Sequence, residues 1–109
     1  MGKFVVSVRK DGDFQFNLLA TNGQVILTSQ GYNSKASCLN GIESVKKNAQ
    51  VIERFDCKVA KNGKPYFNLM ATNGQVIGAS QMYASERTMT AGIQSVMRNA
   101  PEAVVVEAE

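Results

Sequence analysis

The sequence contains no histidine, only two cysteines, and no apolar run longer than four residues. Without histidine, the chain lacks the commonest general base and the commonest metal ligand of proteins. Cys38 and Cys57 are 19 residues apart, which matches no metal-ligand spacing. A membrane-spanning helix needs roughly 20 apolar residues, and a signal peptide needs its own apolar segment. We therefore expect no catalytic residue, metal site or cofactor, no membrane association, and a cytoplasmic protein that is not an enzyme.

The composition is that of a folded protein without a concentrated charge. Hydrophobic residues make up 44% of the chain and charged residues 19%, which is too apolar for a disordered segment. The net charge of +3 is spread, because residues 1–53 hold 6 basic and 4 acidic side chains and residues 54–109 hold 6 and 5. A dedicated nucleic-acid binder usually carries a basic stripe. The charge pattern therefore favours a protein or peptide partner over nucleic acid.

An internal duplication organises the chain. Shifting the sequence by 51 residues aligns residues 4–49 with residues 55–100 without a gap, and 24 of these 46 positions are identical. The phrase ATNGQVI occurs once in each copy. Two copies are too few for a solenoid. We expect one domain, residues 1–109, that is built from repeats of about 1–53 and 54–109 and is a monomer with pseudo-two-fold symmetry.

The first half of each copy has the pattern of three β-strands. Alternating apolar residues indicate strands at residues 4–10 and 14–20, with counterparts in the second copy. The pair Asn22-Gly23 then separates two β-prone runs, as Asn-Gly does again in the second copy. Such a pair is typical of a two-residue type I′ hairpin turn, which needs positive φ at both positions. The sequence therefore predicts a hairpin tip inside the repeated phrase.

The second half of each copy changes to helical periodicity. Apolar residues at helical spacing predict helices that start after Ser34 and Ser85, which are suitable N-caps, and end near Asn48 and Asn99. Short fourth strands are expected at Gln50 to Glu53 and at Glu102 to Glu107. The fold class predicted is α+β, with duplicated β3-α-β units that form one mainly antiparallel sheet and two helices on one face.

The duplication also indicates the surroundings of the two thiols. Cys38 aligns with Met89 on the expected helix, and Cys57 aligns with Val6 on the expected first strand. Each cysteine thus has an apolar counterpart, and a buried free cysteine behaves as a small hydrophobic residue. We expect both thiols to be buried and unreactive.

The hairpin register assigns side chains to two faces of the sheet. With a two-residue loop, Leu19 is opposite Ile26 and Asn17 is opposite Thr28, on the face that does not carry Phe16. If the helices cover one side only, this second face is open, with apolar residues in a polar setting. Its predicted residues are Asn17, Leu19, Gln24, Ile26, Tyr66, Asn68, Met70, Gln75 and Ile77. The face is either an ordinary solvated surface or a binding surface.

A stripe of small residues follows one side of each expected helix. Glycine inside a helix costs about 1 kcal/mol relative to alanine, and this cost occurs twice, at Gly41 and Gly92. The repeated glycine indicates either close packing of the helices on each other or on the sheet, or a groove for a partner.

The segment FNLLATNGQVILTSQGYNSKASCLNGIESVKKNA resembles the YegP-like family of tandem-repeat bacterial proteins, a domain of unknown function. The second copy departs from the family pattern at Glu86 and Met97, where the first copy has Lys35 and Lys46. The resemblance implies two β3-α-β units in one sheet that exchange their last strands. Under that exchange the strand after the first helix would complete the second unit, and AVVVE the first. It implies no activity, cofactor or catalytic residue.

Two functional hypotheses follow for a partner of unknown identity. The first is a small interaction module that binds a protein or peptide through the open sheet face. The alternative is weak, salt-sensitive nucleic-acid binding, with basic side chains on phosphates and Tyr66 stacked on a base. Binding to phosphates weakens steeply between about 50 and 200 mM salt, whereas apolar docking hardly changes.

Overall fold

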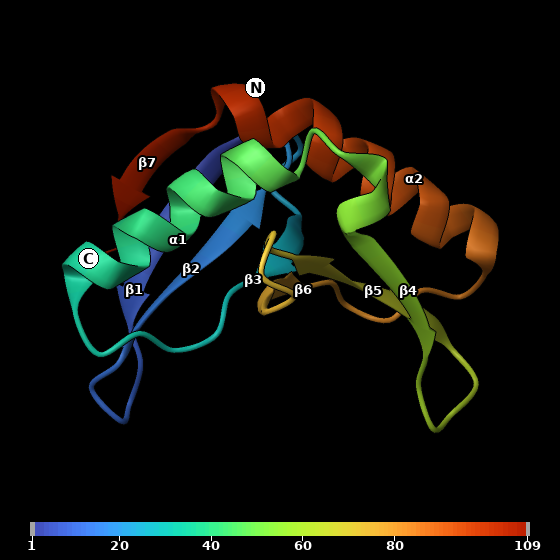
Figure 1. Cartoon of the computed structure of the whole chain (residues 1–109), viewed down its shortest axis with the longest axis horizontal. Helices are drawn as coiled ribbons and strands as arrows, with labels where there is room; N and C mark the ends of the chain where they lie inside the picture. The colour runs from blue at the N-terminus through green and yellow to red at the C-terminus, as the bar shows by residue number, and fades with distance from the viewer. Residues whose placement is uncertain (1, 109) are drawn as a thin grey trace.

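One seven-stranded sheet and two α-helices make up residues 2–108, the part of the chain that the computed structural model describes (Figure 1). The strands are β1 (Lys3–Val8), β2 (Phe14–Leu19), β3 (Val25–Thr28), β4 (Phe55–Val59), β5 (Pro65–Met70), β6 (Val76–Ala79) and β7 (Val104–Glu107), and the helices are α1 (Lys35–Asn48) and α2 (Glu86–Asn99). The order in the sheet is β4-β5-β6-β3-β2-β1-β7. Every pair is antiparallel except β1 and β7, which are parallel. The predicted α+β class with one sheet and two helices is confirmed.

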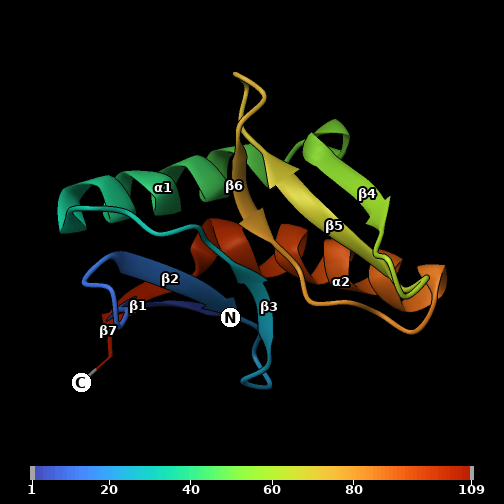
Figure 2. The same ribbon diagram turned by 90° about the horizontal axis from the view of Figure 1, so that it is seen from below.

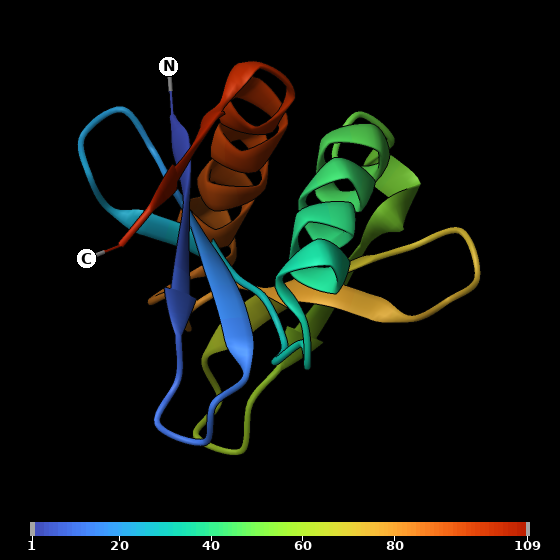
Figure 3. The same ribbon diagram turned by 90° about the vertical axis from the view of Figure 1, so that its left-hand side faces the viewer.

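Both helices pack on the same face of the sheet. They lie side by side in Figure 3, and the view from below in Figure 2 shows the strands in front of them. Helix α1 contacts β2 of the first copy and also β5 and β6 of the second, whereas α2 contacts β5 and β3. Each helix therefore covers strands from both copies, and the two copies share one core. Within residues 2–108, no helix is long and apolar enough to cross a bilayer.

The helices begin and end where their capping residues predict. The hydroxyl oxygen of Ser34 accepts a hydrogen bond from the Ser37 amide (3.1 Å), and Ser85 caps α2 in the same way. At the other end, the Asn48 side-chain amide donates to the Ser44 carbonyl (2.9 Å). Asn99 makes the equivalent bond in α2. The buried asparagines thereby close the last turn of each helix.

The core repeats one aromatic arrangement in each copy. The rings of Phe4 and Phe16 meet edge to face with centroids 5.6 Å apart, and Phe16 stacks on Tyr32 at 6.2 Å. The second copy repeats both distances with Phe55, Phe67 and Tyr83. Phe4, Phe16 and Phe67 are fully buried. As predicted, the alternate apolar residues of the strands face the helices.

The hairpin turn differs from the prediction by one residue. The Ala20 amide donates to the Gln24 carbonyl (2.9 Å), so the loop holds three residues and not two. Among residues 2–108 only glycines have positive φ, and here it is Gly23, at +86°. Asn22 keeps negative φ because its side-chain oxygen accepts a hydrogen bond from the Gln24 amide (3.0 Å). The turn is therefore a three-residue loop with glycine in the left-handed region, and the predicted type I′ turn is wrong.

A bulge compensates for the longer loop. Leu19 lies opposite Val25, but Leu18 lies opposite Leu27, as the two-residue loop had predicted. The residue between, Ile26, has no partner across the strands. The bulge therefore restores the predicted register over the rest of the hairpin.

The bulge removes two isoleucines from the predicted open face. Ile26 is 6% exposed and Ile77, its counterpart, is 9% exposed, and both belong to the hydrophobic core. Their predicted position was wrong because a strict period of two fails at a bulge, where two successive residues turn to one side.

The expected strand at Gln50 to Glu53 is absent from the described structure. A 3-10 helix, Ile52–Arg54, leads from α1 directly into β4. Only a few residues separate α1 from Phe55, too few to form a strand and turn back into the next one. The corresponding 3-10 helix in the second copy, Ala100–Glu102, leads instead into β7, which pairs with β1 of the first copy.

The two cysteines have different surroundings. Cys38 is fully buried in the core, as predicted, whereas Cys57 is exposed. The prediction for Cys57 was wrong because its counterpart Val6 lies on β1, which is flanked by β7, while β4 is the outermost strand at the other end of the sheet. The alignment pairs Cys57 with Val6 correctly, but it does not show that Val6 has a strand on its outer side and that Cys57 has none among the described strands.

Candidate functional site

Many residues that the two copies share have structural roles. The Ser29 hydroxyl oxygen accepts a hydrogen bond from the Phe16 amide (2.9 Å) and donates to the Gln30 carbonyl (2.8 Å). Ser80 makes the same two bonds in the second copy. These bonds connect the segment after β3 to β2 and the segment after β6 to β5. The repeated serine is therefore explained by the fold.

A tyrosine ring packs against the stripe of small residues on each helix. A Cβ at Gly41 would lie 2.7 Å from Cζ of Tyr32, and a Cβ at Gly92 would lie 2.5 Å from Cζ of Tyr83. Both distances are too short for a real side chain, so glycine is needed at both positions. Burial raises the pKa of both phenols above its ordinary value of 10.0. The two glycines therefore serve the packing of the tyrosine rings, although Thr88, Gly92 and Ser95 also line a small hollow of about 210 Å³.

Because these shared residues serve the fold, the positions at which the two copies differ are the candidates for a binding site. A hollow of about 580 Å³ is lined by residues of the second copy alone. It is lined by Ala60, Lys61, Asn62, Tyr66, Ala79, Ser80, Gln81 and Met82. Tyr66 lies opposite Lys58 and points away from the helices, as the alternation with the buried Phe67 requires. The hollow therefore opens on the face of the sheet that the helices leave uncovered.

The first copy fills the equivalent place. The Arg9 guanidinium lies against Gly31, where a Cβ would also meet the Asp13 carboxylate at 2.8 Å. Arg9 is held there by an ion pair with Asp11 (3.5 Å). In the second copy alanine replaces this arginine, and Met82 replaces the glycine. Loss of the arginine leaves the space open.

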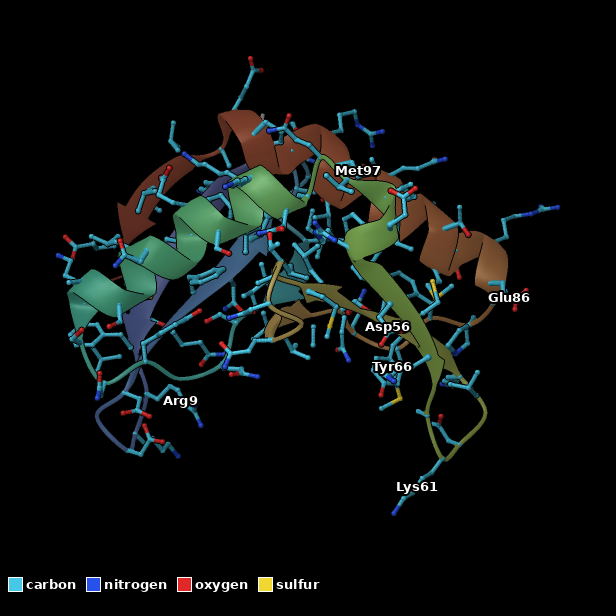
Figure 4. The ribbon with its side chains drawn as sticks, viewed as in Figure 1. Arg9, Asp56, Lys61, Tyr66, Glu86 and Met97 are labelled. Carbon is cyan, nitrogen blue, oxygen red and sulfur yellow. The ribbon has the colours of Figure 1, made fainter. Side chains whose placement is uncertain are left out.

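The rim of the hollow is polar, and an ion pair lies on the strand beside it. The Asn62 side-chain amide donates to Sδ of Met82 (3.4 Å), which holds the thioether at the edge. On the adjacent strand, Lys58 pairs with Asp56 (3.3 Å). Figure 4 shows Asp56 and Tyr66 on neighbouring strands above Lys61, which lies at the hairpin tip. The arrangement offers an aromatic ring, a thioether and a lysine to one bound group.

A second hollow of about 480 Å³ continues the first across the centre of the sheet. The two share Ala79, Ser80 and Gln81. The second lies where β3 and β6 meet by a single pair, Thr28 opposite Ala79. Val25 and Val76 add apolar lining. Together the two hollows form one groove, which we call the central groove, running from Tyr66 to the junction of the two copies.

The structure brings only part of the predicted face into this groove. Asn17, Leu19, Tyr66, Asn68 and Met70 are half-buried, and Gln24 and Gln75 are exposed near the hairpin tips. Of all nine predicted residues, only Tyr66 lines the central groove.

Sequence reasoning missed several of the residues that line the groove. Ala60 and Met82 are the clearest, and the signal that marks them is their difference from Arg9 and Gly31 in the alignment of the two copies. Tyr66 differs from its counterpart Gln15 in the same way. Within residues 2–108, no three Cys, Asp or Glu side chains gather where they could hold a metal ion.

Comparison with known proteins identifies the family. The family described as Domain of unknown function (DUF1508) matches residues 10–56 and again residues 60–107. The chain belongs to this family. The two matches agree with an internal duplication, and the resemblance to YegP-like proteins is confirmed. The DUF1508 family carries no assigned catalytic activity.

The relatives of this DUF1508 chain are bacterial and of similar length. A UPF0339 protein of Pseudomonas aeruginosa is 56% identical over 101 residues, which cover 93% of this chain and 92% of the relative. UPF0339 protein YegP of Escherichia coli O157:H7 is 51% identical over 98 residues, or 90% and 89%.

Two solution NMR structures of DUF1508 relatives have the same fold. That of protein YegP of unknown function from E. coli matches with a TM-score of 0.93 and 47% identity, covering 97% of this chain and 91% of that one. That of a UPF0339 protein from Shewanella oneidensis matches with a TM-score of 0.91 and 46% identity, covering 97% and 90%.

Proposed function

We propose that this chain is a non-catalytic interaction module that binds an extended segment of a partner protein on the uncovered face of its sheet. The segment would lie in the central groove, with one side chain in the hollow around Tyr66. A single observation carries the proposal: the hollow exists in the second copy, whereas the Arg9 guanidinium lies against Gly31 at the equivalent place in the first. A duplicated protein that keeps its shared residues for the fold can change the others for binding.

The size and lining of the hollow suit a peptide side chain. Ligand pockets usually measure about 300–1,000 Å³ and are mostly apolar with a few polar groups. Tyr66 supplies a rigid aromatic surface, and Met82, which is 54% exposed, supplies an adaptable one. Asn62 and Gln81 offer hydrogen bonds at the rim. An apolar or aromatic side chain of the partner is therefore the expected occupant.

The proposal treats residues 1–109 as one domain that acts as a monomer in the cytoplasm. Support comes from the helices, each of which covers strands of both copies, so that neither copy closes its core alone. The pairing of β7 with β1 also joins the end of the second copy to the start of the first. We interpret this pairing as strand exchange in one direction. Sedimentation at several protein concentrations tests whether the protein is a monomer.

One observation favours a second candidate, weak binding of single-stranded nucleic acid. Lys61 and Tyr66 line the same hollow, and a cation beside an aromatic ring can hold a phosphate and stack a base. The overall charge is low for this role. The two candidates differ in their response to salt, because only phosphate binding releases counterions.

Affinity capture from a bacterial lysate, with and without nuclease, tests the proposal. The variant Ala60→Arg/Met82→Gly gives the second copy the arginine and the glycine of the first but not Asp11, the ion-pair partner of Arg9, so the new arginine is expected to occupy the hollow by its size. Thr90→Arg is the control, because it adds the same charge at an exposed position of α2, on the opposite side of the sheet. Nuclease-resistant capture by wild type and control, but not by the filled variant, would support the proposal. Capture that nuclease abolishes, or that falls steeply between about 50 and 200 mM salt, would favour nucleic acid.

A further inference from the structure

The two ends of the sheet are equivalent in sequence but not in structure. Strand β1 carries β7 along its outer edge, with Phe4 opposite Val105 and Val6 opposite Glu107. Strand β4, the counterpart of β1, is the last strand at the other end and has β5 as its only neighbour among the described strands. The β1 end of the sheet therefore shows how a further strand pairs there, whereas no described strand pairs along the outer edge of β4.

The free edge of β4 presents backbone groups in the same pattern as β1. The carbonyl of Val6 accepts a hydrogen bond from the Ala108 amide (2.8 Å), so Val6 turns its backbone outward. In β4 the Ala60 amide donates inward to the Lys64 carbonyl (2.9 Å). Successive residues of a strand turn their amides to opposite sides. Cys57, the counterpart of Val6, therefore points its N–H and C=O to the free edge, as does its alternate neighbour Val59, whereas the Phe55 N–H donates to the Ile52 carbonyl.

Exposed apolar side chains accompany this edge. Val6 is 4% exposed, whereas Cys57, which also points to the helix side, is exposed. Val59, further along β4, is 70% exposed. Ile52, in the 3-10 helix that leads into β4, is 53% exposed. An edge strand with unpaired backbone groups and apolar side chains is a template for another strand.

The charge at the start of each helix distinguishes the two edges. Lys35, the first residue of α1, forms an ion pair with Glu107 of β7. Its counterpart in α2 is Glu86, which has no ion pair among the described residues and lies at the first turn of the helix in Figure 4. A strand that docked on β4 as β7 docks on β1 would bring its fourth residue to Glu86. That residue must be basic to match.

We infer that the edge of β4 binds an extended segment of a partner protein, parallel to β4, with β-branched residues followed by a lysine or arginine that pairs with Glu86. The backbone hydrogen bonds bind an extended segment of any sequence, and the Glu86 carboxylate selects a segment with a basic residue at the matching position. The site lies at the edge of the sheet, so it does not depend on the central groove. A second copy of β7 is a poorer occupant, since it would bring Glu107 to Glu86.

The probe is a seven-residue peptide with the sequence of residues 102–108 and the Glu107→Lys change, EAVVVKA, compared with the native sequence EAVVVEA. Each is titrated into isotopically labelled wild-type protein at low salt, and backbone amide shifts are followed by NMR. We expect shifts along β4 and at the start of α2, with the lysine peptide binding about threefold or more tighter, the size of an exposed ion pair. In Glu86→Lys the preference should reverse.

Two variants at one position separate edge binding from other binding. Cys57→Pro removes an outward N–H, which an edge strand tolerates, and should abolish the shifts while the pairing of β4 with β5 remains. Cys57→Ser keeps the N–H and should bind as wild type does.

Five outcomes would overturn the inference. The first four are no shifts at millimolar peptide, shifts centred on Tyr66 and Met82, shifts on β1 where the peptide displaces β7, and a preference that Glu86→Lys leaves unchanged. Shifts of the β4 amides with protein concentration alone would assign the edge to a second copy, and would overturn it as well.

Discussion

The guanidinium of Arg9 lies against Gly31 and takes the place that a side chain at position 31 would need. The second copy has Ala60 and Met82 at these positions, and a hollow forms there. The two copies thus differ at a solvent-facing site while they keep the same aromatic core. This difference gives the pseudo-symmetric molecule one distinct face.

The tyrosine rings over the helices make a prediction about stability. Gly41→Ala and Gly92→Ala should each lower the free energy of unfolding by about 1–3 kcal/mol, the usual effect of overpacking a filled core. The new Cβ would meet a tyrosine ring, and its higher helix propensity cannot compensate. Urea unfolding followed by circular dichroism measures the change.

A neighbouring position provides the control for the glycine variants. Asn40 is exposed on the same turn of α1, so Asn40→Ala should raise stability by about 0.5 kcal/mol through helix propensity alone. If Gly41→Ala raised stability by a similar amount, the packing of Tyr32 on the helix would be contradicted.

The two thiols should react at very different rates. Cys57 is exposed and should be alkylated in the native protein, whereas Cys38 is fully buried and burial raises the pKa of its thiol. Alkylation of Cys38 then requires opening of the core, which slows it by about three orders of magnitude or more for a protein of ordinary stability. Mass spectrometry of the peptides gives both rates. Equal rates in the native state would contradict the burial of Cys38.

Stability should fall at alkaline pH because of two phenols. Burial, with a smaller contribution from the Cys38 thiol for Tyr32, raises the pKa of Tyr32 and Tyr83 above 10.0 in the folded state. The unfolded chain therefore loses these protons first, and the stabilisation present below pH 10 is lost as the pH rises through the folded pKa values. Urea unfolding at increasing pH measures this loss.

The matched variant for the pH series is Tyr32→Phe/Tyr83→Phe. It keeps both rings and removes both protons, so the alkaline decrease in its stability should be smaller than in wild type. All other side chains are the same in the two proteins, so the difference between the two series is due to the phenols. An identical decrease in the two proteins would show that these phenols do not contribute.

The ion pair of Lys35 with Glu107 should be weak and sensitive to salt. Both side chains are about half exposed, 47% and 62%, so a double-mutant cycle with Lys35→Ala and Glu107→Ala should give a coupling of about 0.2–1 kcal/mol. The coupling should shrink at 1 M salt, where the Debye length is about 3 Å. A coupling of zero at low salt would remove the argument for charge selection at Glu86.

Much of the fold could be predicted from the sequence because local signals agree with the tertiary structure. Ser34 and Ser85 cap their helices, and Asn48 and Asn99 end them, as the residue types indicate. The apolar alternation placed Phe16 and its neighbours correctly under the helices. These features depend on residues close together in the chain.

The errors arose where a feature depends on distant residues or on one inserted position. Asn22-Gly23 is compatible with two loop lengths, and the backbone bond between Ala20 and Gln24 shows that the longer one forms. Val6 is buried beside β7, a strand of the other copy, and no described strand takes the equivalent place beside Cys57, which its own sequence does not reveal.

The central groove could be predicted only in part. Tyr66 was included because it faces away from the helices, but the hollow beside it depends on a missing arginine at Ala60. The missing arginine can be recognised only when equivalent positions of the two copies are compared in the structure. Five residues that line the hollow differ from their counterparts in the first copy, and such a comparison selects them: Ala60, Asn62, Tyr66, Ala79 and Met82.

The most direct test of the proposed interaction module is the affinity of one selected peptide for two forms of the protein. Random peptides displayed on phage are enriched on wild type, and the dissociation constant of the best is measured by calorimetry on wild type and on Ala60→Arg/Met82→Gly. We predict a loss of at least about tenfold in the filled variant, or about 1.4 kcal/mol, with Thr90→Arg unchanged. Equal affinity for wild type and the filled variant would contradict binding in the central groove.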